Sequence, residues 1–270
     1  MPIENTEATF KLQDRTAIIT GPANSFNQAI AMKLTQMGAN VALVDRNIEK
    51  MERFANQLMD AREVHERYGR AIAVQADLSK LYHVQDAISR AAESFGGIDI
   101  YVDGLMTTEA KPFKDPTVLE DLDRVIDVNL RSPLMVTQAV MRFLEGRKRG
   151  RIVYLMHDLA RLGMPQNSLL AMTRTGLSSF ARTLSREVAE NNITVNCVAL
   201  GITEEFLLAQ TANQAISIQE AQNHLLRAFP YAQMTEPERI ASTVAFLASP
   251  LGAGITGQTL AVSQGLSFLS

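Results

Sequence analysis

The sequence predicts an α/β fold, in which a doubly wound parallel sheet of about seven strands carries helices on both faces. Short apolar, β-branched segments alternate with longer amphipathic segments along the whole chain. Strands that are apolar on both sides belong to a sheet covered on both faces, and strand–helix–strand alternation requires right-handed crossovers between parallel strands. No linker, repeat or low-complexity tract divides the 270 residues, so a single domain is expected.

The expected strands are, in chain order, 16–20, 40–45, 71–77, 98–103, 151–156, 193–200 and 258–263. Helical patterns fill the intervals, at 27–38, 46–68, 80–95, 115–146, 167–190 and 236–248. The first of these helices places Ile30 and Leu34 on one stripe and stops at Gly38, a favourable residue for a helix end. The third runs from Ser79, a candidate N-cap, to a stop at Gly96.

Two segments fall outside this alternation. Residues 202–235 form the long interval between a strand and the next helix, and their Gln, Asn and Ala content predicts a local helix on a mobile substrate-side flap. Residues 1–11 are expected to be a loose N-terminal tail that precedes a domain spanning 12–270.

Composition excludes several classes of protein. The 26 Lys and Arg residues are outnumbered by 29 Asp and Glu residues, so nucleic acid is not an expected partner. The 46% share of hydrophobic residues is too high for a disordered chain. Cys197 is the single cysteine and no Cys/His cluster occurs, which predicts neither an internal disulfide nor a metal site. No apolar run approaches the roughly 18 residues of a membrane span, and the polar N-terminus does not resemble a signal peptide. The expected location is the cytoplasm.

The turn after the first strand resembles that of the short-chain dehydrogenase/reductase superfamily, T-G-x-x-x-G-x-G, in its position and in Gly21. Other matching segments follow in order, namely VALVDR at 41–46, Asp77-Leu78, DVNL at 127–130, GRIV at 150–153, ITVNCVALG at 193–201 and ITGQTLAV at 255–262. The resemblance covers about residues 12–266 and implies a Rossmann-like fold, NAD(P)-dependent oxidoreductase chemistry and a tetramer.

The glycine turn departs from the family pattern, because Ser25 and Asn27 stand where the second and third glycines are expected. A side chain at position 25 crowds the site that a pyrophosphate needs. In one interpretation Ser25, Phe26 and Asn27 still bind the cofactor, with the two polar side chains donating to a phosphate; the spacing from Gly21 to Asn27 is similar to that of the enoyl reductase branch. In the other, Ser25 and Asn27 only cap the following helix.

Further cofactor contacts are implied by the resemblance. Asp45 ends the second strand, where a carboxylate takes the ribose hydroxyls and repels a 2′-phosphate, so NAD(H) is the cofactor expected if one binds. The alternative is that Asp45 simply starts the next helix. Asp77 and Leu78 would contact the adenine edge. Asp103 stands where the family has N-N-A-G beside the cofactor.

The catalytic positions are mostly replaced. The family uses a Tyr acid, a Lys, a Ser and an Asn, and counting from Gly150 puts Leu170 at the Tyr position, Arg174 at the Lys position and His157 at the Ser position. Asn129 alone keeps the expected type. Leu170 has no proton to give, which excludes the family's usual mechanism. His157 is either a new acid/base or a strand-end residue beside solvent, and Arg174 either keeps the cationic role or lies on an exposed helix turn.

These features predict a catalytically silent protein or a partner subunit in a homo- or hetero-tetramer of similar subunits. The helix at 167–190 supports a subunit seam, because it carries more apolar surface than one sheet face requires. Two alternatives remain, an atypical NAD-dependent oxidoreductase that uses His157 as acid/base, and a cofactor-free enzyme built on His157 and Arg174. A small-molecule ligand fits each of them.

Overall fold

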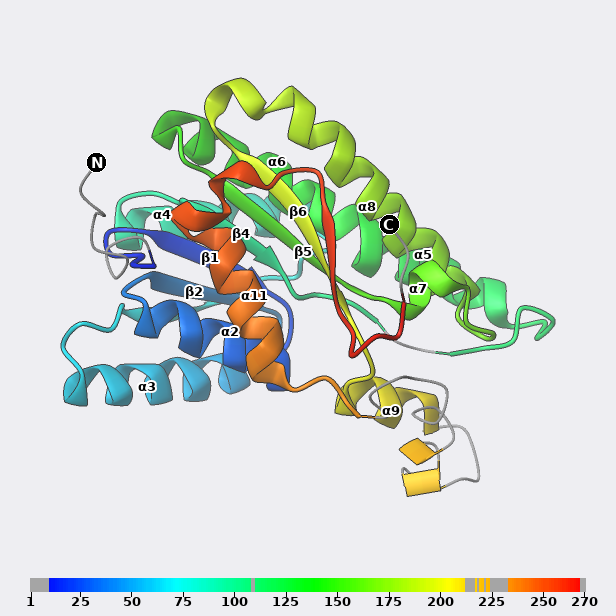
Figure 1. Ribbon diagram of the computed structural model, residues 1–270. Coiled ribbons are helices and arrows are strands. Elements are labelled where there is room, and N and C mark those ends of the chain that lie inside the picture. Colours follow the sequence, from blue (N-terminus) through cyan, green and yellow to red (C-terminus); the bar gives the residue numbers. More distant parts are fainter. Residues whose placement is uncertain are drawn as a thin grey trace.

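Seven parallel strands form one sheet in the computed structural model, in the order β3-β2-β1-β4-β5-β6-β7 (Figure 1). The structure describes residues 10–107, 110–211, 217, 219–220, 222–223 and 233–267. The strands are β1 Thr16–Thr20, β2 Asn40–Asp45, β3 Ala71–Gln75, β4 Ile100–Asp103, β5 Arg151–His157, β6 Thr194–Leu200 and β7 Thr259–Val262. The order along the chain reverses between β1 and β4, and ligands bind at such a switch point in open α/β sheets.

Helices cover both faces of the sheet (Figure 1). On one face lie α2 (Ser25–Gln36), α3 (Ile48–Val64) and α11 (Pro237–Ala248), and on the other lie α4 (Leu81–Phe95), α6 (Ser132–Arg147) and α8 (Ser168–Glu187). A hydrophobic core lies on each face of the sheet, and alternate residues of β1 belong to one or the other. Ile18 packs with α4 and α6, whereas Ala17 and Ile19 pack with α2. This confirms the doubly wound fold that the sequence predicts.

The expected strands and helices match closely, with one exception. The helix expected over 115–146 is interrupted, and comprises the 3-10 turn η1 (Val118–Asp121), α5 (Leu122–Ile126), the π-helical turn η2 (Asp127–Arg131) and α6. Pro133 explains the break, because it has no N–H to bond the carbonyl of Asn129 one turn earlier. The short α7 (Leu159–Leu162) and two 3-10 turns, η3 (Ala189–Asn191) and η4 (Pro250–Gly254), complete these elements.

The predicted flap begins with the helix α9 (Glu204–Thr211), which agrees with the local helix expected there. Residues 212–216, 218, 221 and 224–232 lie outside the described residues, and so does most of that prediction. Residues 1–9 of the expected tail also lie outside them. Leu12 is buried against the core and its N–H donates to the carbonyl of Met37. Among the described residues no helix is long and apolar enough to cross a membrane.

Candidate functional site

A cavity of about 840 Å³ opens at the carboxyl ends of β1 to β4, beside the switch point of the sheet. Its walls come from the loops after these strands and from α5 and η2. They include Pro22, Ala23, Asp45, Arg46, Ala76, Asp77, Leu78, Leu105, Thr107 and Ser132. The volume suits a small organic ligand.

One end of the cavity gathers the residues expected to hold an adenosine group. Asp45 lies at the end of β2, and its Oδ1 accepts a hydrogen bond from the Asn47 N–H at 2.9 Å. Asp77 Oδ1 accepts from both the hydroxyl and the N–H of Ser79, at 2.7 and 3.0 Å. The Ser79 hydroxyl is the main cause that lowers the pKa of Asp77, so this carboxylate is ionised at neutral pH. Leu78 lines the same end.

The turn between β1 and α2 is filled by close backbone contacts and by the side chain of Asn27. Gly21 has φ +110°, and a Cβ there would lie 2.6 Å from the Gly104 backbone, so glycine is required. Asn27 is buried, and its Nδ2 donates to the carbonyls of Pro22 and Gly104 at 2.9 and 3.2 Å. Position 27 therefore ties the turn to the loop after β4.

The expectation that Ser25 and Asn27 cap the helix is wrong. Asn24 is the N-cap, and its Oδ1 accepts from the Asn27 N–H at 2.9 Å, which places both predicted residues inside α2. Phe26 is buried in the core against the sheet, and the side chains of residues 25–27 do not line the cavity. The Ser25 N–H instead donates to Glu205 Oε1 at 2.8 Å. The sequence carried no signal for this contact, because 180 residues separate the partners.

Arg174 is fully buried, so the prediction of an exposed helix turn is wrong. It lies on the face of α8 that Leu170 and Leu177 turn toward the sheet, at helical spacing from both. Its Nη1 donates to Asp103 Oδ2 at 2.8 Å, and its Nη2 donates to the carbonyl of Leu105 and to Asn129 Oδ1, the latter at 3.4 Å. The guanidinium is thus engaged by the chain.

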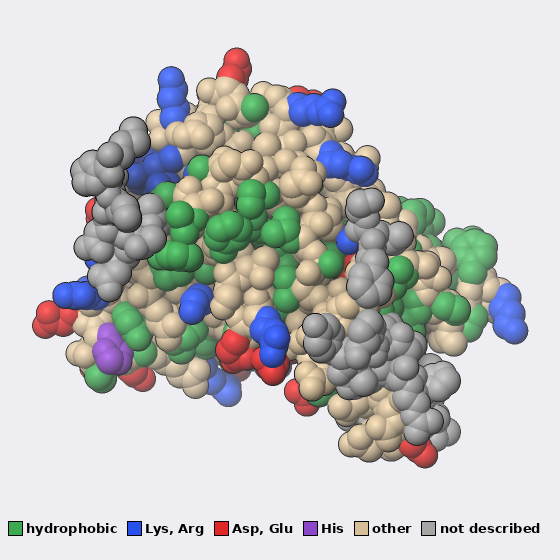
Figure 2. Space-filling view, in the orientation of Figure 1, with side chains coloured by type: hydrophobic (Ala, Val, Ile, Leu, Met, Phe, Trp, Pro, Cys, Tyr) green, Lys and Arg blue, Asp and Glu red, His purple; other side chains and the backbone are tan. Residues whose placement is uncertain are grey.

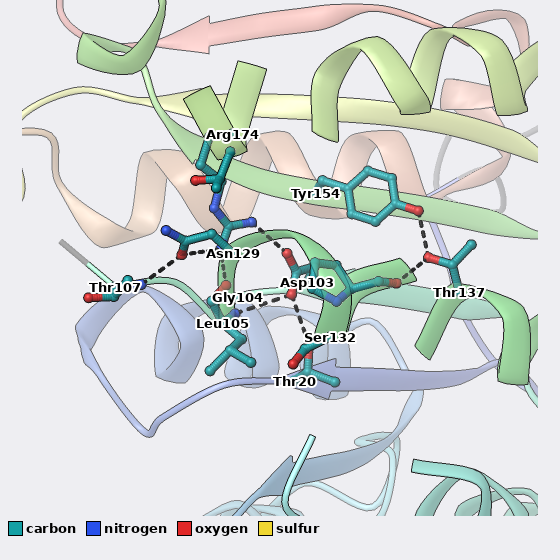
Figure 3. Close-up of polar contacts among 12 residues, drawn as sticks. Thr20, Asp103, Gly104, Leu105, Thr107, Asn129, Ser132, Thr137, Tyr154 and Arg174 are labelled. Carbon is teal, nitrogen blue, oxygen red and sulfur yellow. Dashed lines mark hydrogen bonds and ion pairs between the residues drawn. The ribbon is translucent and has the colours of Figure 1, made fainter. Parts of the chain in front are cut away.

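Asp103 receives two further hydrogen bonds, from the Thr20 hydroxyl at 3.2 Å and from the Leu105 N–H at 3.4 Å (Figure 3). Burial raises the pKa of Asp103, and the Arg174 guanidinium counteracts that effect. Three hydrogen bonds, one of them from the cation of Arg174, satisfy the carboxylate as an ion. The sequence flagged Asp103 and Arg174 separately, and the structure brings them together as a pair.

Asn129 lies in the π-helical turn η2 and is fully buried. Its Oδ1 accepts from the Thr107 N–H at 2.9 Å as well as from Arg174. Its Nδ2 has no hydrogen-bond partner among the described residues. Asn129 therefore joins Asp103 and Arg174 in one buried cluster, and its Oδ1 accepts hydrogen bonds from groups of the protein.

His157 ends β5 and is 1% exposed, so the expectation that it lies beside solvent is wrong. Helix α9 covers it, and the ring centroids of His157 and Phe206 lie 4.8 Å apart. Burial, and then the charge of Arg174, lowers the pKa of His157 to about 4. Its neighbour Asp158 pairs with Arg161 at 3.2 Å and accepts from the Ser267 hydroxyl at 2.6 Å. A hydrogen bond with the Gly201 backbone and the charge of Glu205 act in the opposite direction on the pKa of His157, as smaller effects.

Other phenols do not replace the missing tyrosine. Leu170 is buried and aliphatic. Tyr154 pairs its hydroxyl with Thr137 at 2.6 Å, and Tyr101 lies 3.4 Å from the hydroxyl of Thr20. Burial raises the pKa of both phenols, so neither is a useful acid at neutral pH. In the described ranges no phenol hydrogen-bonds Asn129, and no group of three potential metal ligands occurs.

The fold is that of the Rossmann-like α/β proteins. Its typical features are the parallel sheet with a cavity at the switch point, the glycine turn before the first helix and the carboxylate that ends β2. The family model described as "Enoyl-(Acyl carrier protein) reductase" matches residues 21–267. The chain belongs to the short-chain dehydrogenase/reductase superfamily of oxidoreductases, within which it is matched by many relatives.

The relatives match over nearly their whole length. The chain is 30% identical over 263 residues to nodulation protein G of Rhizobium meliloti, covering 96% of this chain and 100% of that protein. It is 29% identical over 257 residues to a 3-oxoacyl-(acyl-carrier-protein) reductase of Aquifex aeolicus, covering 95% and 98%. A crystal structure of a dehydrogenase/reductase from Sinorhizobium meliloti is similar with a TM-score of 0.83 at 28% identity, over 96% of this chain and 98% of that one.

The residues of this chain fit only part of a dinucleotide. The adenosine end fits, because Asp45 and Asp77 line an open cavity. The diphosphate position does not fit, since the Ser25 N–H is already bonded to the Glu205 carboxylate. The nicotinamide side does not fit either, because Arg174 Nη1 is bonded to Asp103 there, although Arg174 Nε has no hydrogen-bond partner among the described residues.

Proposed function

We propose that this chain is a catalytically silent member of its superfamily, which serves as a binding or partner subunit. The observation that carries the proposal is the fully buried Arg174, bound to Asp103, Leu105 and Asn129. By resemblance this position holds the Lys that assists a catalytic Tyr and contacts the cofactor. Here the cation is neutralised by the protein, and Leu170 offers no proton.

His157 is a poor substitute for the missing acid. With a pKa of about 4, its imidazole is neutral at pH 7, and its conjugate acid is scarcely populated. General acid–base catalysis works best with a pKa near the operating pH and contributes about 10²–10⁴ in rate. This disfavours both the atypical oxidoreductase and the cofactor-free enzyme that a functional His157 would require.

Apolar surface at the edge of the sheet supports a role as a partner subunit. Strand β7 is one of the two edge strands and is only half buried, and Leu251 in η4 is exposed. Figure 2 shows hydrophobic side chains gathered over the region of η4 and α11. Met172 adds exposed apolar surface on α8. We propose contacts with similar subunits here, in a homo- or hetero-tetramer.

The test compares the isolated chain with a relative that carries Y-x-x-x-K. Both proteins are assayed for NADH and NADPH oxidation with ketones, aldehydes and enoyl thioesters, and the chain tagged in its own cells is examined by native mass spectrometry. We expect no turnover by the isolated chain, turnover by the relative, and an oligomer that contains this chain and an active subunit. Turnover by the isolated chain that a folded His157→Ala variant loses would overturn the proposal.

A further inference from the structure

Glu205 lies against the start of α2, the helix that follows β1. Its Oε1 accepts the hydrogen bond from the Ser25 N–H at 2.8 Å. Its Oε2 is buried and has no hydrogen-bond partner among the described residues. The carboxylate is therefore inserted between the two elements and held at the helix start by this bond.

Apolar packing places Glu205 there. Its neighbours Phe206 and Leu207 are fully buried, in a small cluster with Leu159, Ile202 and Leu266. This anchors α9 over the end of β5. The position of the carboxylate thus follows from the packing of the helix that carries it, and not from a surface side chain that reaches across solvent.

The start of α2 favours an anion. The free N–H groups and the positive end of the helix dipole meet there. The helix has 12 residues, and its own first turn contains no acidic residue. Asn24 caps the Asn27 N–H and leaves the Ser25 N–H for another acceptor. Glu205 supplies the negative charge that this helix end lacks.

We propose that Glu205 acts as a built-in anion that excludes a diphosphate, so that the cavity selects nucleoside-like ligands over dinucleotides. A diphosphate at the Ser25 N–H would have to displace a like-charged carboxylate. The nucleoside end stays open, because Asp45 and Asp77 line a cavity of about 840 Å³. This inference rests on the proposed function only in treating the cleft as a binding site.

The test uses adenosine and ADP-ribose, which share the nucleoside and differ by the diphosphate and second ribose. Both are titrated calorimetrically into the wild-type chain, Glu205→Gln and Glu204→Gln. Glu204 is the exposed neighbour in α9, so its substitution changes the net charge equally.

We expect wild type to bind ADP-ribose no more tightly than adenosine. In Glu205→Gln, ADP-ribose should bind roughly tenfold to hundredfold more tightly. The diphosphate then competes at the Ser25 N–H with a neutral amide and no longer with a charged carboxylate, which forms the stronger hydrogen bond. Adenosine affinity should not change, and Glu204→Gln should behave as wild type.

Three outcomes would overturn the proposal: equal gains in both Gln variants, ADP-ribose at least tenfold tighter than adenosine in wild type, or no adenosine binding by any variant. Hydrogen exchange of the Ser25 amide measures the bond to Glu205 without any ligand. The exchange should be faster in Glu205→Gln but not in Glu204→Gln. ADP-ribose carries no nicotinamide, so these results do not depend on hydride transfer. The silent-subunit proposal and this one can therefore fail separately.

Discussion

Burial decides what the three polar residues of the catalytic region can do. His157, Asn129 and Arg174 are each almost fully buried. Arg174 forms an ion pair with Asp103, whereas at His157 burial and the charge of Arg174 outweigh the opposing charge of Glu205 and hold the imidazole neutral. Residue type alone suggested a titrating histidine and a free cation. Desolvation and pairing reverse both expectations.

Stability should depend on His157 at mildly acidic pH. Its pKa falls from an ordinary 6.5 to about 4 in the folded chain, so between these values the unfolded chain binds more protons. The free energy of unfolding should therefore fall as pH falls through this window, by about 3 kcal/mol from this residue. Urea unfolding at pH 7 and pH 4 should show that His157→Asn removes that part of the pH dependence. His83→Asn, at an exposed site, should keep it, and equal slopes in all three proteins would contradict the buried neutral imidazole.

At the scale of elements, Asn27 and Gly104 are two departures from the family pattern that lie in contact with each other. Asn27 in α2 occupies the space beside Gly104, in the loop after β4, and donates to its carbonyl. A Cβ at position 104 would overlap Asn27 Oδ1. The Asn27 side chain thus has room because Gly104, on the other side of the turn, has no side chain. This allows α2 to lie close to β4.

This coupling predicts a non-additive pair of variants. Gly104→Ala should lower the free energy of unfolding by about 1–3 kcal/mol through overpacking against Asn27. In the Asn27→Gly, Gly104→Ala double variant, the loss should be smaller than the sum of the single losses by about 1 kcal/mol. Denaturant unfolding measures these differences.

Gly146→Ala in α6 is the matched control. A Cβ there meets nothing within 4 Å, so this change should stabilise the helix by about 0.5–1 kcal/mol. Strict additivity at positions 27 and 104 would show that the two residues are not coupled.

In the whole molecule, the pair of Asp103 and Arg174 ties helix α8 to the sheet beside the switch point. Asp103 ends β4 beside the switch point, and Arg174 comes from α8, which packs on β5 and β6. By resemblance, the position of Arg174 holds the Lys that contacts the cofactor. In the proposed silent subunit, one interaction therefore stabilises the fold and also engages the cation at that position.

Arg174→Met should leave the Asp103 carboxylate buried without its cation and lower the free energy of unfolding by about 3–5 kcal/mol. Adding Asp103→Asn should recover part of the loss, because the buried charge is then removed. Arg186→Met, at an exposed position of the same helix, should change stability by less than about 0.5 kcal/mol. Thermal and urea unfolding of wild type and these three variants check this. Equal losses of unfolding free energy at positions 174 and 186 would refute a structural role for the pair of Asp103 and Arg174.

Local patterns were sufficient for the fold. Apolar runs and helical stripes predicted all seven strands and their order along the chain, because each strand is buried on both sides and each helix buries one stripe. They also placed Asp45 and Asp77 at strand ends that line the cavity. The interrupted helix after β4 was missed, although Pro133 is a local signal for a break in a helix.

The sequence by itself determined the architecture and the absence of a phenol at Leu170, because these depend on residue type and local periodicity. Only the tertiary structure decided what the remaining polar groups contact. Glu205 meets the Ser25 N–H, and Arg174 meets Asp103, across large separations along the chain. Such pairings arise from how the helices pack over the sheet, so no local pattern encodes them. Burial then sets their charges, because a desolvated group is ionised only where the fold brings it a partner.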